Sequence, residues 1–284
     1  MADPVRKIAI PPERPVLSLL ETEPGITLER WVQGPGGEMK HVVLPLTPER
    51  FLNPQIGDKM NQGPRHFEAV LEIYSLLREH FRKDPKVLVV GDAKHFFAPG
   101  LPAPGPDVSV IPGVRVKNDP RRASFRAERE GVLPCLIIEV VSPLDSRIRQ
   151  TDLQTKVEVY QSAGVSEYVI VDSTLQDLRF RLVGYRLDGA GRYQRIEPDA
   201  KGRILSATTN LWFQVSPDGE RVLVFERPTG RRLLNLAEQE ARASREAKAR
   251  KAAEKKALVE SEARSAAEAE VAALRAEIER LRKA

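Results

Sequence analysis

A strand–helix–strand run in the middle of the chain constrains the fold more than any other feature of the sequence. Residues 136–141 (LIIEVV) predict a buried strand, and residues 151–163 predict a helix that ends at Gly164. Residues 168–171 (YVIV) predict a second buried strand. Because two strands joined by a helical crossover of this length lie parallel in one sheet, the run predicts an α/β fold.

Other segments extend this core in both directions. Residues 86–91 and 107–111 predict short apolar strands, and the alternating pattern from 178 to 225 predicts antiparallel hairpins. Residues 66–81 predict an amphipathic helix with one buried stripe. The stripe consists of apolar residues at spacings of three and four: Phe67, Val70, Leu71, Tyr74, Leu77 and Phe81. The expected architecture is a mixed sheet flanked by helices.

The two ends of the chain differ from this core. Residues 1–50 are rich in proline and glycine, which predicts an N-terminal arm with short strands at 26–32 and 40–44. Residues 237–284 contain neither glycine nor proline, which predicts one helix roughly 70 Å long. We therefore expect three parts: an arm at 1–50, a central domain at 51–232 and a C-terminal helix at 233–284.

The last turns of the C-terminal helix carry a coiled-coil seam. Four apolar residues are separated by three, four and three positions, as the a and d positions of heptads are: Val271, Leu274, Ile278 and Leu281. Earlier in the helix the same phase falls on Ala267, Arg264 and Glu260, so the seam fades. Two clear heptads give only marginal pairing; if this terminal seam pairs, the chain forms a homodimer with two sites.

Charge and cysteine content exclude several classes of protein. The chain has a net charge of +5, and residues 231–284, with 14 basic and 10 acidic side chains, hold most of it. A near-neutral body excludes a broadly basic surface, so nucleic acid would have to bind through a local patch or a metal. Cys135 is the single cysteine, which favours a reducing, cytoplasmic location. No signal peptide and no apolar run of the roughly 20 residues needed for a membrane helix is present.

Three residues point to chemistry. Asp107 begins an expected strand after a loop, where a carboxylate can face a cleft, although an aspartate in a turn is the simpler interpretation. Glu139 interrupts an apolar strand, and a buried carboxylate requires a partner, a proton or a metal. The alternative interpretation is that Glu139 lies on the solvent face of an edge strand. Lys156 occupies a core-facing position of its helix, although a surface pair with Asp152 also fits.

Together these residues fit a single mechanism. Asp107 and Glu139 offer hard oxygen ligands to Mg²⁺ or Mn²⁺, and the backbone carbonyl of Val140 offers a third. Such a metal acidifies a bound water and neutralises charge on a scissile phosphate. Lys156 would orient the nucleophile or stabilise the transition state. The hypothesis is a metal-dependent endonuclease that hydrolyses phosphodiester bonds in DNA.

The same residues carry a family resemblance over roughly residues 50–235. The matching segments are Pro106-Asp107, Ile138-Glu139-Val140-Val141-Ser142-Pro143, Asp152…Lys156…Tyr160, Gly164-Val165-Ser166-Glu167-Tyr168 and Val171-Asp172. In combination they resemble the Uma2 family, which is classed with restriction endonucleases in the PD-(D/E)xK nuclease superfamily. The resemblance implies a restriction-endonuclease-like core and a Uma2-like nuclease domain at 51–232. The superfamily motif expects lysine where this chain has Val141, and the resemblance implies that Lys156 replaces it from the following helix.

An alternative function and some weaker candidate residues stay open. The alternative is a non-catalytic interaction protein that keeps the nuclease-like fold and oligomerises through its C-terminal helix. Glu68 and Asp92 are further candidate acidic ligands, each with a simpler interpretation on the surface or in a turn. The histidines show no metal-ligand spacing. Four arginines are candidates for phosphate contacts: Arg121, Arg122, Arg126 and Arg129.

Overall fold

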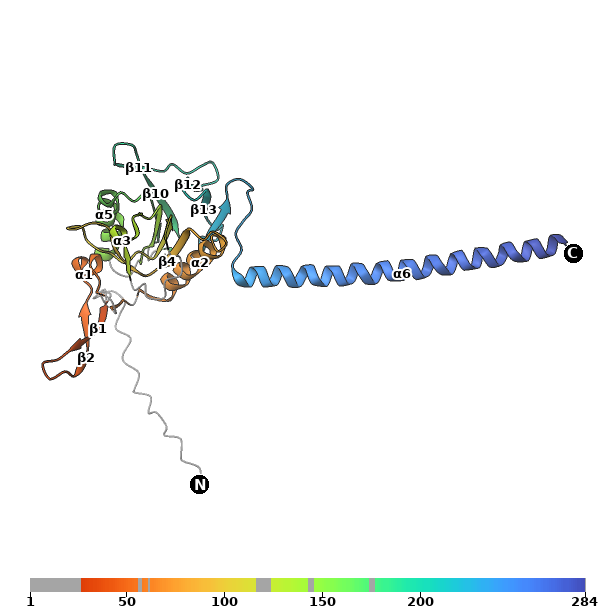
Figure 1. Cartoon of the computed structure of the whole chain (residues 1–284), viewed down its shortest axis with the longest axis horizontal. Helices are drawn as coiled ribbons and strands as arrows, with labels where there is room; N and C mark the ends of the chain where they lie inside the picture. The colour runs from red at the N-terminus through yellow and green to blue at the C-terminus, as the bar shows by residue number, and fades with distance from the viewer. Residues whose placement is uncertain are drawn as a thin grey trace, which may run out of the picture. The chain divides into compact units, whose positions relative to one another are not determined.

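The computed structural model describes residues 27–55, 58–60, 62–115, 124–142, 146–173 and 177–283. The chain divides into two compact units, one that ends at Leu233 and one that begins at Leu234. The first unit contains all the sheets of the described residues, and the second consists of the helix α6 (Leu236–Lys283), as Figure 1 shows.

A six-stranded mixed sheet forms the centre of the first unit. Its order is β11 (Tyr193–Arg195), β10 (Arg181–Leu187), β9 (Glu167–Asp172), β8 (Leu136–Val140), β6 (Val108–Pro112) and β4 (Val87–Gly91). Strands β8 and β9 run parallel, with Ile138 opposite Val169, whereas the other neighbours are antiparallel. The structure therefore confirms the predicted parallel pair and the α/β class.

Both faces of the central sheet are covered. On one face, α2 (Pro64–His80) packs together with β13 (Leu211–Val215) and β14 (Val222–Glu226). On the other face lies α5 (Lys156–Ala163), the helix between β8 and β9 (Figure 1). Since successive side chains of β8 alternate between the two faces, this strand is apolar on both sides apart from Glu139.

The buried face of α2 overlaps the predicted stripe only in part: Leu77 is buried and Val70, Tyr74 and Phe81 pack against the core. Ile73, Leu76 and Leu77 are buried, whereas Phe67 and Leu71 of the predicted stripe are 64% and 49% exposed. The helix carries two overlapping apolar stripes at spacings of three and four, and the sheet covers the one that includes Ile73 and Leu76. The periodicity predicted the helix and four of its packing residues, but it placed Phe67 and Leu71 on the buried face instead of Ile73 and Leu76.

The crossover helix begins earlier than predicted and is interrupted. It starts with α4 (Ser146–Gln150), continues as a π-helical turn η1 (Thr151–Thr155) and becomes α5. The backbone N–H of Lys156 donates to the carbonyl of Thr151, five residues earlier, which is the π pattern. The helix ends at Gly164 as predicted, because the φ of +80° there suits a residue without a Cβ.

Part of the expected N-terminal arm is ordered into a small sheet. The strand β1 (Thr27–Gln33) pairs antiparallel with β2 (Met39–Pro45) and with β3 (Lys59–Met60). The short helix α1 (Pro48–Leu52) lies between β2 and β3 in the chain. The predicted strands are confirmed, apart from residue 26, which lies outside the described residues. Leu28, Leu46 and Phe51 pack against Ile148 of α4, so this sheet shares a core with the crossover helix.

Smaller elements complete the described part of the first unit. The strand β12 (Ile204–Ser206) pairs with β13, which pairs with β14, so the predicted hairpins are confirmed. Strands β5 (Lys94–Phe96) and β7 (Ser124–Arg126) form a parallel pair followed by α3 (Ala127–Glu130). Across the described ranges, no helix combines the length and the apolar character needed to cross a membrane.

Candidate active site

Asp107 and Glu139 meet at the junction of β6 and β8. Val108 pairs with Ile138, so Asp107 continues the register opposite Glu139. The backbone N–H of Val140 donates to Asp107 Oδ2 at 2.7 Å, and this bond turns the Asp107 side chain toward β8. Two carboxylates that are 32 positions apart in the sequence are therefore neighbours because their strands pair.

Lys156 reaches this junction from the first turn of α5. Its Nζ lies 3.0 Å from Glu139 Oε1 and 2.8 Å from Asp152 Oδ1, and it also sits 3.9 Å from the centroid of the Phe51 ring. The Lys156 side chain is 1% exposed, so it points into the core and not to solvent. The structure brings the three predicted residues together and shows that the Asp152–Lys156 pair is buried.

A hydrogen-bond network holds the carboxylates in place. Tyr160, one turn after Lys156, donates its hydroxyl to Glu139 Oε1 at 2.6 Å. Tyr168 of β9 donates to the backbone carbonyl of Asp152 at 3.0 Å, which anchors the π-helical turn to the sheet. Asp152 Oδ1 accepts no well-aligned hydrogen bond from the described residues, so its contact with Lys156 is an ion pair alone.

Two more side chains lie on the Asp107 side of the cluster. His66, in the first turn of α2, places its Nε2 3.3 Å from Asp107 Oδ2. Asp92, just after β4, donates its backbone N–H to the Asp107 carbonyl at 3.3 Å and has a positive φ of 47°. Partial burial and the Asp107 charge raise the pKa of Asp92. Asp92 thus lies at the rim of the cluster, where the sequence left its role open.

Burial sets the protonation of the cluster. It raises the pKa of Glu139 from 4.5 to about 8 and that of Asp152 from 3.8 to about 6, although Lys156 opposes both shifts. Burial would lower the pKa of Lys156, but Asp152, Glu139 and Asp107 together raise it. The pKa of Asp107 is lowered despite burial, because His66 and Lys156 stabilise its charge. Three carboxylates thus share one ammonium and one imidazole.

The cluster is open on one side only. Side-chain exposure is 1–2% for Glu139, Asp152 and Lys156, against 12% for Asp107 and 11% for His66. Beside the open side lies a cavity of about 270 Å³ whose lining includes His66, Val140 and Phe180. The cluster is therefore accessible from the Asp107 side, because Phe51 lies over the ammonium.

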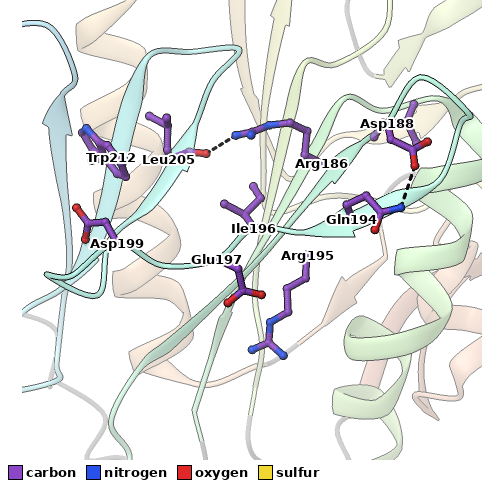
Figure 2. Close-up of a pocket in the computed structure, with 10 residues that line it drawn as sticks. Arg186, Asp188, Gln194, Arg195, Ile196, Glu197, Asp199, Leu205 and Trp212 are labelled. Atoms are coloured by element: carbon purple, nitrogen blue, oxygen red, sulfur yellow. Dashed lines mark hydrogen bonds between the residues drawn. The ribbon is translucent and has the colours of Figure 1, made fainter.

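A larger pocket elsewhere contains none of the predicted residues. It has a volume of about 420 Å³ and is bordered by residues of β10 and β11 together with Leu205 and Trp212, as Figure 2 shows. Within it, Arg186 donates to the Leu205 carbonyl and Gln194 donates to Asp188. Its wall contains two basic and three acidic side chains, so its charge selects no single class of ligand.

The chemistry of the donor set fits a hard divalent cation. Magnesium keeps several waters and takes one or two protein carboxylates, which Asp107 and Glu139 supply. No three His, Cys, Asp or Glu side chains form a ready-made metal centre within the described part of the chain. The expected set of two carboxylates and the Val140 carbonyl needs no third such side chain. Burial raises the pKa values of Glu139 and Asp152, so a bound cation would stabilise their ionised forms.

Sequence reasoning missed one member of the cluster, and the structure decides some of the weaker candidates. Glu68 is exposed on α2, whereas His66, two residues earlier, takes the position beside Asp107. No spacing signal in the sequence indicates His66, because its partner lies on a distant strand. Arg126 stacks on the Phe96 ring at 4.0 Å, whereas Arg121 and Arg122 lie outside the described residues.

A mixed sheet with this acidic junction and a lysine from the crossover helix defines a restriction-endonuclease-like α/β protein. A family model described as "Uma2: Putative restriction endonuclease" matches residues 50–248. The chain belongs to the Uma2 family. Among solved structures it is similar to "a putative nuclease belonging to DUF820 from Anabaena variabilis", with 20% identity, a TM-score of 0.36 and coverage of 64% of this chain and 82% of that chain. No curated protein matches the chain.

Proposed function

We propose that this protein is a divalent-metal-dependent endonuclease that hydrolyses phosphodiester bonds in DNA. One observation carries the proposal: the Lys156 ammonium lies 3.0 Å from Glu139 inside the core, beside the junction that also holds Asp107. Buried carboxylates and a buried lysine cost stability unless they are paired or functional, so their convergence favours a catalytic centre. Membership of the Uma2 family supports a nuclease.

Asp107, Glu139 and the Val140 carbonyl would hold Mg²⁺ or Mn²⁺ on the open side of the cluster. When bound, such an ion supplies a water of lowered pKa and neutralises charge on the scissile phosphate. The near-neutral body of the chain is consistent with contact to DNA through a metal rather than through a broad basic surface.

The residues of the chain orient this site. The Val140 N–H and His66 hold the Asp107 carboxylate, and Tyr160 holds Glu139 Oε1. Lys156 keeps a fixed positive charge next to Glu139, where it can stabilise negative charge that develops on the phosphate. Because these groups are fixed by hydrogen bonds before substrate arrives, little reorganisation is needed during the reaction.

A cleavage assay tests the proposal. Purified protein is incubated with supercoiled plasmid, linear duplex, single-stranded DNA and RNA, each with Mg²⁺, Mn²⁺ or a chelator. We expect metal-dependent nicking that Asp107→Asn, Glu139→Gln and Lys156→Met each reduce at least about a hundredfold. Glu68→Gln, which alters an exposed carboxylate on α2, is the matched control and should retain activity.

The assay refutes the proposal if wild-type protein and the three variants are equally inactive on every substrate with both metals. Cleavage that survives in all three variants would also refute it, because it would arise from another site or a contaminant.

One observation favours the alternative of a non-catalytic interaction protein. Glu139, Asp152 and Lys156 are nearly inaccessible, as expected if the cluster only holds the crossover helix against the sheet. Titration calorimetry with Mg²⁺ and Mn²⁺ separates the two functions. The nuclease requires metal binding that Asp107→Asn abolishes, whereas a purely structural cluster binds neither ion.

A further inference from the structure

The end of α6 exposes an apolar stripe that nothing in the described chain covers. Val271, Leu274, Ile278 and Leu281 are 48%, 56%, 51% and 72% exposed on a helix otherwise dominated by alanine and charged residues. Their spacing of three, four and three places all four on one side of the helix. Such a stripe is typical of a helix that packs against another helix.

The residue types at these positions select the number of helices. Val271 and Ile278 occupy the a positions and are β-branched, whereas Leu274 and Leu281 occupy the d positions. β-branched residues at a with leucine at d favour a parallel two-stranded coiled coil. Trimers and tetramers favour other combinations at these positions.

The flanking charges select the partner and its direction. Glu270 and Glu277 occupy the g positions, and Arg275 and Arg282 occupy the e positions. In a parallel pair in register, each g residue meets the e residue five positions later on the other helix, so both glutamates meet arginines. An antiparallel pair would instead place glutamate against glutamate and arginine against arginine. A second copy of this chain is therefore complementary in one orientation.

We propose that residues 267–283 of α6 form a parallel, in-register coiled coil with a second copy of this chain. In such a pair both chains enter the coil from the same end. The inference depends on α6 alone and does not require that the proposed nuclease be active. Because the seam spans only about two heptads, the dimer dissociates on dilution.

Sedimentation of the full-length protein over a range of concentrations tests the pairing. We expect a monomer–dimer equilibrium in which Leu274→Glu raises the dissociation constant at least tenfold. Ala276→Glu introduces the same charge at an f position, away from the seam, and should leave the equilibrium unchanged. Circular dichroism confirms that both variants keep α6 helical. A wild-type chain that stays monomeric at about 100 µM, a trimer, or equal weakening by both substitutions overturns the proposal.

Charge exchange tests the partner, and a disulfide crosslink tests the direction. Arg275→Glu with Arg282→Glu makes the four charged e and g positions (270, 275, 277 and 282) all acidic, and Glu270→Arg with Glu277→Arg makes them all basic. Neither double variant should dimerise alone, whereas an equimolar mixture should form a heterodimer. A Leu281→Cys variant in a Cys135→Ala background should form a disulfide-linked dimer on oxidation, because d positions face each other only in the parallel register. Absence of that crosslink in a protein that dimerises would overturn the parallel arrangement.

Discussion

Replacing Lys156 by methionine tests the acidic cluster without reference to activity. Methionine keeps the length of the side chain but removes the ammonium that lies 2.8 Å from Asp152 and 3.0 Å from Glu139. All three side chains are at most 2% exposed, so water cannot replace the lost charge without a rearrangement of the core. Removal of one partner from a buried ion pair costs about 3–5 kcal/mol.

Proton uptake limits this loss and makes it depend on pH. Glu139, with a pKa of about 8, is already largely protonated at pH 7, so the uncompensated charge falls mainly on Asp152, with a pKa of about 6. Without Lys156 both pKa values rise further. A carboxyl whose pKa is higher in the folded than in the unfolded protein loses stability as pH rises between the two values. We therefore expect a loss of about 3 kcal/mol at pH 7, less at pH 5 and more at pH 8.

Urea unfolding followed by tryptophan fluorescence measures this loss. Trp31 and Trp212 both lie in the first unit, so the signal does not include α6. Asp152→Asn and the double variant complete a mutant cycle, in which the coupling energy should exceed about 1 kcal/mol. Lys201→Met, at an exposed lysine, is the control. A loss below about 0.5 kcal/mol for Lys156→Met, or an equal loss at pH 5 and pH 8, would refute the assignment of a buried ion pair.

Two further predictions concern the core outside this cluster. Burial lowers the pKa of His95 from 6.5 to about 4 in the folded protein. As pH drops from 6.5 toward 4, His95 therefore takes up a proton in the unfolded chain but not in the folded one, and the free energy of unfolding falls. At about 1.36 kcal/mol per pH unit, this amounts to about 3 kcal/mol. Denaturant titrations should show this slope reduced in His95→Gln and retained in the control His41→Gln, and an unchanged slope in His95→Gln would contradict the reasoning. Gly184→Ala would place a Cβ 2.8 Å from Ile204 Cγ2, which should cost about 1–3 kcal/mol in thermal or urea unfolding. Gly189→Ala, which meets nothing within 4 Å, is its matched control, and equal stability of the two variants would contradict the packing at Gly184.

Local patterns in the sequence predicted most elements of the first unit. Residues 136–141 and 168–171 are mostly apolar because both faces of their strands are covered. A strand covered on both faces needs apolar residues at consecutive positions, and a local pattern shows this directly. The tail without proline or glycine predicted α6, because helix propensity is also a local property of the sequence. The π-helical turn at Thr151–Thr155 was not predicted, because its hydrogen bonds differ from those of an α-helix by one residue and leave no periodic signal.

The sequence alone indicated that Glu139 needs a compensating group if its strand is buried and that Lys156 stands at a core-facing position of its helix, because a charge in an apolar pattern is costly unless it is paired. Only the tertiary structure decided which groups compensate them. Strand pairing brings Asp107 across from Glu139, α2 brings His66 to Asp107, and Phe51 covers the ammonium. These contacts join residues far apart in the chain. Their energies depend on which segments pack together, and a local sequence pattern does not predict that packing.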